Sequence, residues 1–170
     1  MALLRRREKP PAAVSALFEG DERAVAWADA AGPDDTTTSV VASTLGLWWP
    51  FDDGHRRLPW ERIDKVVWRD GWLAATEADV LDDELLVERP AVRVRLTAPR
   101  DLPPVVRKRI EANVVKTEVL SVAGGAVRFV ARRRPGEDGV IWWARLEPGT
   151  RLTDDIRAAV AARLALLRAG

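Results

Sequence analysis

The sequence predicts an α+β protein in which many short antiparallel strands are combined with a few helices. Three observations support this class. Residues 92–96 alternate apolar and polar side chains, as in a strand with one buried face. The dipeptides Asp70-Gly71 and Gly124-Gly125 are turn signals between apolar segments. From residue 154 to 168 the apolar positions change to helical spacing.

The composition is that of a compact globular chain, with 170 residues, 47% hydrophobic and 31% charged. The absence of cysteine excludes disulfides, thiolate nucleophiles and Cys-ligated metals, and the simplest expectation is a cytoplasmic protein. The net charge of +1 is too small for the protein as a whole to attract nucleic acid electrostatically. Of the 27 basic residues four are lysines, so the other 23 are arginines, a bias typical of GC-rich coding rather than of a binding site.

Residues 1–20 are predicted to form a basic tail and a short helix of one or two turns. The apolar run after the tail is too short and too polar for a signal peptide or a membrane span. The tail arginines Arg5, Arg6 and Arg7 have two interpretations. A solvated end is the default, and peripheral contact with an anionic membrane or nucleic acid is the alternative.

Seven strands are predicted before the first long helix. They are residues 23–29, the two arms of a hairpin within 39–51, and residues 56–60, 63–69, 72–76 and 92–96, with 85–87 as an irregular part of the sixth. The segment 77–88 carries six acids and no base, and we expect it to be an exposed loop that leads into that irregular part.

The C-terminal part is predicted to contain two helices and a meander. Asp101 is expected to cap a helix with Pro103 and Pro104 in its first turn, where their missing amides cost nothing. Its expected apolar stripe is formed by Val106, Ile110 and Val114. The meander is predicted to have three strands, at residues 117–122, 127–133 and 140–146. The last helix is predicted at residues 154–168, with Thr153 as its cap and one apolar face made of Ile156, Val160, Leu164 and Leu167.

Seven antiparallel strands followed by a helix is the element order of a pleckstrin-homology-like (PH-like) fold, a bent sheet or barrel plugged by that helix. Residues 40–47, VVASTLGL, resemble the "v-v-a-T-x-x-G-L" hairpin of bacterial PH-like proteins, and residues 57–63, RLPWERI, resemble their "l-p-W-x-x-I" junction. The chain most closely resembles small uncharacterised actinobacterial proteins with such a core.

The resemblance implies a fold and a non-enzymatic role, and it carries over no functional residue. It covers residues 21–116, with the meander and last helix of residues 117–170 packed on this core as one compact unit. Phosphoinositide readers of this superfold use basic residues in the loop between the first two strands. Here that loop, residues 30–38, contains Asp34 and Asp35 and no base, so we do not expect that activity.

No catalytic, cofactor-binding or metal-ligating residue is predicted. The only histidine, His55, is in a predicted polar loop and lacks the further ligands or the nucleophile that a metal site or a general base would need. The serines have no Gly-x-Ser-x-Gly setting, and Gly124-Gly125 belongs to a turn.

The tryptophans give the most specific functional indication. In Trp48-Trp49 and Trp142-Trp143 successive strand residues point to opposite faces, so one member of each pair needs a second environment. In one interpretation the meander and last helix fold over the outer face of the sheet and cover the outward tryptophan of each pair. In the other, an outward ring anchors a protein partner or a second copy of the chain.

Two basic clusters suggest anion or nucleic-acid binding as the alternative to a protein interface. Arg107, Lys108 and Arg109 form one, and Arg132, Arg133 and Arg134 form the other. Joined, they would bind an anion or nucleic acid, although no aromatic residues interleave with them. We expect a non-catalytic binding or scaffold module that acts through protein contacts, and nucleic acid is not the expected partner.

The stretch 58–73 contains Trp60, Trp68 and Trp72 and is interpreted as a structural hinge of the sheet. Trp60 and Trp68 are predicted to face the core, and Trp72 opens the next strand.

Overall fold

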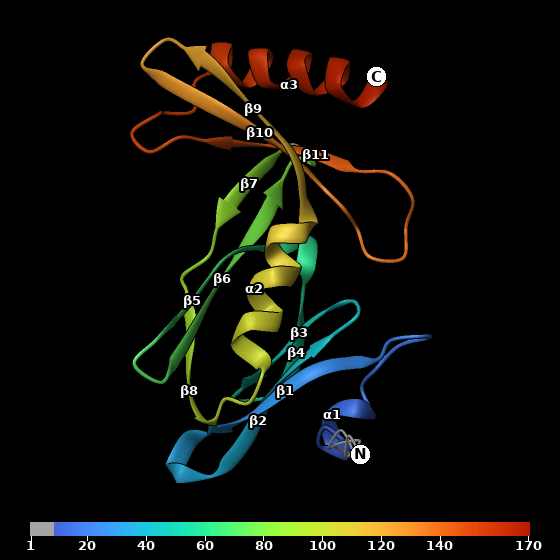
Figure 1. Cartoon of the computed structure of the whole chain (residues 1–170). Helices are drawn as coiled ribbons and strands as arrows, with labels where there is room; N and C mark the ends of the chain where they lie inside the picture. Colours follow the sequence, from blue (N-terminus) through green and yellow to red (C-terminus); the bar gives the residue numbers. More distant parts are fainter. Residues whose placement is uncertain (1–8) are drawn as a thin grey trace.

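The computed structural model describes residues 9–170, and Figure 1 shows an elongated molecule with α1 near one end and α3 at the other. Within this range eleven strands form one continuous mixed sheet, in the order β4-β3-β2-β1-β8-β6-β7-β11-β10-β9, with β5 paired to β6. The α+β class predicted from the sequence is confirmed.

The N-terminal half, up to the end of α2, is an antiparallel sheet with a helix against it. Its elements are α1 (Ala12–Ser15), β1 (Ala24–Ala31), η1 (Pro33–Asp35), β2 (Thr37–Ser43), β3 (Gly46–Phe51), β4 (Gly54–Pro59), η2 (Trp60–Arg62), β5 (Ile63–Arg69), β6 (Trp72–Leu81), β7 (Leu85–Glu88), β8 (Val92–Ala98) and α2 (Leu102–Asn113). Helix α2 runs along the strands in Figure 1, and its Leu102 and Val106 join Trp49 and Trp60 in the main core.

The end of β6 corrects the loop expected from residue 77 on, whereas β7 lies where a strand was expected at residues 85–87. Strand β6 continues to Leu81, and its last four residues pair with β7. Four of the six acids in residues 77–88 have basic partners outside this segment, and two of these lie in β6: Glu77 accepts from Arg56 at 3.0 Å and Asp79 accepts from Arg89 at 2.7 Å. Ion pairs between strands therefore allow an acidic sequence to form part of a sheet.

Helix α2 differs from the prediction at both ends. Asp101 occupies the N-cap position, but its side chain makes no capping hydrogen bond. Val114, expected on the apolar stripe, is the first residue of the next strand and is partly exposed. The helix ends one residue before the last position of its predicted apolar stripe, because the extended chain pairs with a neighbouring strand from Val114 on.

The C-terminal half is a meander covered on one face by a helix. Its elements are β9 (Val114–Val122), β10 (Gly125–Arg132), β11 (Ile141–Leu146) and α3 (Asp154–Ala169). The predicted cap is confirmed, since Thr153 Oγ1 accepts a hydrogen bond from the amide of Ile156. Ile156, Val160 and Leu164 are buried against Phe129 and Trp142.

The meander extends the sheet and does not cover its outer face. Strand β11 pairs in parallel with β7 through Ala144 and Leu85, and the amide of Ala144 donates to Glu84 O at 2.8 Å. Strand β7 thus joins the meander to the N-terminal half, and α3 lies across the meander at the far end of the molecule (Figure 1). Of the helices in residues 9–170, none combines the length and the hydropathy needed to cross a membrane.

Candidate functional site

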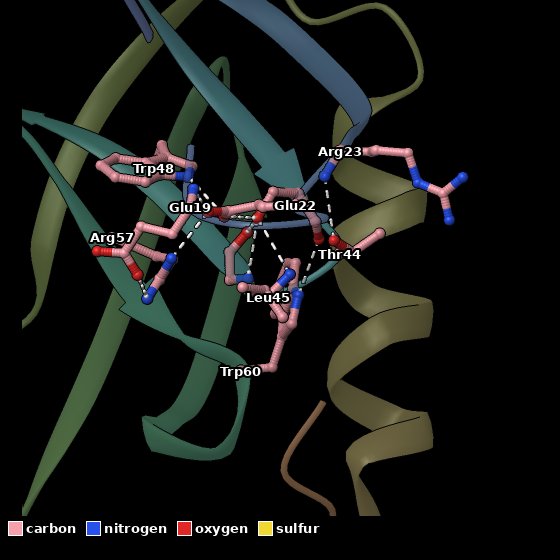
Figure 2. Close-up of polar contacts among 10 residues, drawn as sticks. Glu19, Glu22, Arg23, Thr44, Leu45, Trp48, Arg57 and Trp60 are labelled. Atoms are coloured by element: carbon pink, nitrogen blue, oxygen red, sulfur yellow. Dashed lines mark hydrogen bonds and ion pairs between the residues drawn. The ribbon is translucent and has the colours of Figure 1, made fainter. Parts of the chain in front are cut away.

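The most highly bonded polar group in the N-terminal half is the buried carboxylate of Glu22 (Figure 2). It accepts hydrogen bonds from Ser43 Oγ at 2.5 Å, Trp48 Nε1 at 2.9 Å, the Glu19 amide at 3.1 Å and Arg57 Nη1 at 2.8 Å. Burial alone would raise the pKa of Glu22, but these donors and the Arg57 charge outweigh it and hold the pKa below its ordinary value. The carboxylate has a full set of internal partners, so its role is structural.

Ser43 connects this carboxylate to the hairpin predicted from residues 40–47. Its hydroxyl accepts from the amides of Leu45 at 3.2 Å and Gly46 at 3.1 Å, and its carbonyl accepts from Trp60 Nε1 at 3.0 Å. Gly46 is required by close approach, since a Cβ there would lie 2.4 Å from the carbonyl oxygen of Leu58. Both sequence motifs therefore have structural roles, and Trp60 is buried in the core as predicted.

The paired tryptophans are all buried, which corrects the expectation of an outward anchor. Trp48, Trp49, Trp142 and Trp143 are each at most 7% exposed. Helix α3 covers only one of them, Trp142. Val14 and Phe18 cover Trp48, with the Phe18 and Trp48 rings 6.0 Å apart, whereas Ala78, Leu86 and Val130 surround Trp143. These four rings lack the exposure that contact with a partner requires.

The two basic clusters do not form one patch. Arg132 is buried between the two halves and is paired with Asp64 at 2.8 Å. Arg134 is paired with Glu137 and lies near Glu61, and Arg107 is paired with Glu111 on α2. Lys108, Arg109 and Arg133 remain at least partly accessible. The proposed anion patch thus loses one member to the interior and two to ion pairs.

Arg132 is the centre of the junction between the halves. Its Nη1 donates to the carbonyls of Glu61 and Ile63, both at 3.0 Å, while Nη2 donates to Asp64. Arg145 bridges Asp64 and Glu88 from the other side. Burial alone would raise the pKa of Asp64, but the charges of Arg145 and Arg132 and their hydrogen bonds to this carboxylate hold the pKa below its ordinary value. This network links β5, β7, β10 and β11.

His55 lies in β4 rather than in a loop. Its Nε2 is 2.8 Å from the carbonyl oxygen of Ser39 on a neighbouring part of the sheet. Arg5, Arg6 and Arg7, the residues of the suggested membrane contact, lie outside the described residues.

Strand β5 and helix α2 enclose a groove of about 740 Å³, which we call the β5–α2 groove. Its apolar walls are Val66, Trp68, Pro99, Pro103, Pro104 and Ile110. Trp68 is 40% exposed, which corrects its predicted place in the core. It is still on the core face of the sheet, because it pairs opposite the buried Leu73. Helix α2 leaves this end of the core face uncovered.

The groove follows a strand edge whose main-chain groups are unpaired within residues 9–170. Asp70-Gly71 joins β5 to β6, with Arg69 opposite Trp72. In a two-residue hairpin this closing pair exchanges main-chain hydrogen bonds, and bonded pairs then alternate along the ladder. Val67 thus bonds to β6, whereas Val66 and Trp68 direct their N–H and C=O groups to the free edge. Sequence reasoning placed these residues on a strand but had no signal that its edge would stay open.

Three basic residues and one acidic residue are among those that line the groove. Lys65, Arg100 and Arg107 are the cations, and Glu111 is the acid. Arg100 is held by Asp29 at 3.0 Å and by the Trp27 ring, 3.9 Å from its guanidinium carbon. Lys65 has no ion pair with another described residue. The border therefore favours a ligand that carries negative charge.

Comparison with known proteins adds no functional assignment. No family model matches the chain, and no curated protein or solved structure is significantly similar to it.

Proposed function

We propose that this protein is a non-catalytic binding module that holds an extended segment of a partner protein in the β5–α2 groove. The observation that carries the proposal is the coincidence of an open strand edge with an apolar groove along it. An added strand obtains affinity from main-chain hydrogen bonds and specificity from alternate side chains that enter pockets. Val66 and Trp68 offer both kinds of contact.

The chemistry of the groove specifies the partner segment further. It should be extended, with apolar side chains for the wall made by Trp68, Pro103 and Pro104, and with an acidic residue near the bases that border the groove. A module of this kind needs no catalytic group, in line with the predicted non-enzymatic role.

We also propose that the core is PH-like. Seven antiparallel strands in the order β4-β3-β2-β1-β8-β6-β5, followed in the chain by α2 against their inner face, support this proposal. The hairpin of residues 40–47 and the junction of residues 57–63 support it as well, because their key residues Ser43, Gly46 and Trp60 contact one another. Strand β7 and the meander are additions to such a core.

A displayed library of random peptides of about twelve residues tests the proposed function. We expect the wild-type chain to select acidic, apolar sequences, and Trp68→Ala to weaken their binding by about tenfold or more, as loss of an aromatic anchor does. Trp72→Ala is the matched control. Trp72 is 41% exposed, almost the same as Trp68, but it is on the opposite face of the sheet, where Arg93 stacks on its ring.

A second variant tests the main-chain edge. Val66→Pro removes an N–H that points to the free edge and leaves the β5–β6 hydrogen bonds in place, so we expect it to abolish peptide binding while the far-UV circular dichroism spectrum stays native. Selection of no peptide, or equal binding by wild type, Trp68→Ala and Val66→Pro, would refute the proposal. Salt-dependent retention of single-stranded DNA without any peptide selection would favour the anion-binding alternative.

A further inference from the structure

Strand β9 is the last strand of the sheet, and within residues 9–170 no strand pairs with its outer edge. The strand is nine residues long and contains no proline. Its outer face carries two exposed valines, Val115 at 46% and Val119 at 54% exposed. A long exposed edge of this kind is a template for pairing with another strand.

The hydrogen-bond pattern shows which β9 residues have free main-chain groups. The amide of Glu147 donates to Ala126 O at 3.0 Å, so even-numbered residues of β10 bond toward β11. Odd-numbered residues of β10 therefore bond toward β9, where their partners are even-numbered, as with Phe129 opposite Glu118. The N–H and C=O groups of Val115, Thr117 and Val119 consequently point to the free edge.

The β9 sequence is self-complementary about Thr117. If two copies pair antiparallel with Thr117 opposite Thr117, the odd residues with free main-chain groups face each other. Val115 then lies opposite Val119 of the second copy. Lys116 lies opposite Glu118 of the second copy, whose carboxylate also pairs with Arg163 of its own chain. Each pair occurs twice because of the two-fold axis. Apolar pairs fall on one face and opposite charges on the other, and both stabilise paired strands.

We propose that two copies of this chain associate through their β9 strands in this register, so that the sheet continues from one copy into the other. We choose a second copy of the chain as the partner because Lys116 and Glu118 of one β9 strand match Glu118 and Lys116 of another. The edge at the other end of the sheet, β4, is unsuited to the same contact, because it carries Arg56 and Arg57 and ends at Pro59.

The area buried between the two β9 strands determines the affinity expected for the dimer. One pair of strands covers less than the roughly 800 Å² per partner of a standard stable interface. The dimer should therefore be reversible and depend on concentration. The proposal is independent of peptide binding, since the β5–α2 groove involves neither edge nor outer face of β9.

Analytical ultracentrifugation of the full chain over a range of concentrations tests the proposal. We expect a monomer–dimer equilibrium for the wild type and a monomer for Thr117→Pro, which removes a free-edge N–H without affecting the β9–β10 hydrogen bonds. Ser121→Pro is the matched control. It makes the same change at the same edge, but beyond the residues paired in this register, so the dimer should persist. Melting temperatures and circular dichroism check that each variant is folded.

Charge variants test the register itself. Lys116→Glu and Glu118→Lys each place like charges opposite each other twice, so each alone should weaken the dimer by about tenfold. An equimolar mixture should restore association, because the two variant chains are complementary. A strictly monomeric wild type, a folded Thr117→Pro variant that still dimerises, or a mixture no stronger than its components would overturn the proposal.

Discussion

The two halves of the sheet are stabilised by different means. In the N-terminal half, the tryptophan-rich core is combined with buried polar groups, chiefly Glu22 with its four donors. In the C-terminal half, the meander is held by consecutive hairpins and by the apolar stripe of α3. The N-terminal half depends on contacts between residues far apart in the chain, whereas the C-terminal half depends mainly on residues that are close in sequence. A substitution should therefore have wider effects in the first half than in the second.

The largest expected effect is at Trp60, in the core of the N-terminal half. Trp60 is 2% exposed and donates to Ser43 O. Trp60→Ala should lower the free energy of unfolding by about 3 to 5 kcal/mol, because it leaves a cavity and an unpaired carbonyl. Urea denaturation measures the change.

Trp72→Ala serves as the control for this prediction. Trp72 is half exposed on the outer face, and its truncation should cost less than about 1 kcal/mol. Equal losses for the two variants would show that the core does not depend on Trp60.

An intermediate effect is expected at Glu22, and it should depend on pH. Because the folded-state pKa of Glu22 lies below the unfolded value of about 4.3, its stabilisation is present above that pH and is lost as the pH falls through the folded-state pKa. Glu22→Gln should cost about 1 to 3 kcal/mol at pH 7. The difference from wild type should narrow as the pH falls below about 4.

Denaturation curves between about pH 2.5 and 7 give the measurement. Glu19→Gln is the control, since it removes only the exposed ion pair with Arg57 and should change stability by less than about 1 kcal/mol. A constant difference between wild type and Glu22→Gln over this range would contradict the assigned role of the carboxylate.

The smallest effect is expected at the N-terminus of α3. Thr153→Ala removes the acceptor for the Ile156 amide, 3.3 Å away, and should cost about 1 kcal/mol. Amide hydrogen exchange should show faster exchange in α3 and unchanged exchange in α2, and Thr153→Ser should restore protection. Equal acceleration in both helices would mean that the halves are not stabilised separately.

Local patterns made much of the fold predictable. The hairpin at Asp70-Gly71, the meander and the Thr153 cap all depend on residues that are close in sequence. The extension of β6 over residues 77–81 was missed because the charges of Glu77 and Asp79 are neutralised by Arg56 and Arg89, and strand pairing cannot be read from residue type. The residues that cover Trp48 and Trp143 were missed for the same reason.

The candidate site was less predictable than the fold. Period-two alternation correctly put Trp68 on the core face of β5. Whether that face is covered depends on where α2 crosses the sheet, and this is a tertiary property. The predicted interface tryptophans are buried, whereas Trp68, assigned to the core, borders the groove.

Arg132 has a consequence for how the arginine-rich composition is understood. A GC-rich coding bias places arginine where lysine would serve equally well, but not at this position. The planar guanidinium uses Nη1 for two carbonyls and Nη2 for Asp64, inside the protein. The compact ammonium of lysine does not reproduce this fork and would leave a buried acceptor unpaired. Among the arginines of this chain, Arg132 is therefore one whose identity is fixed by chemistry.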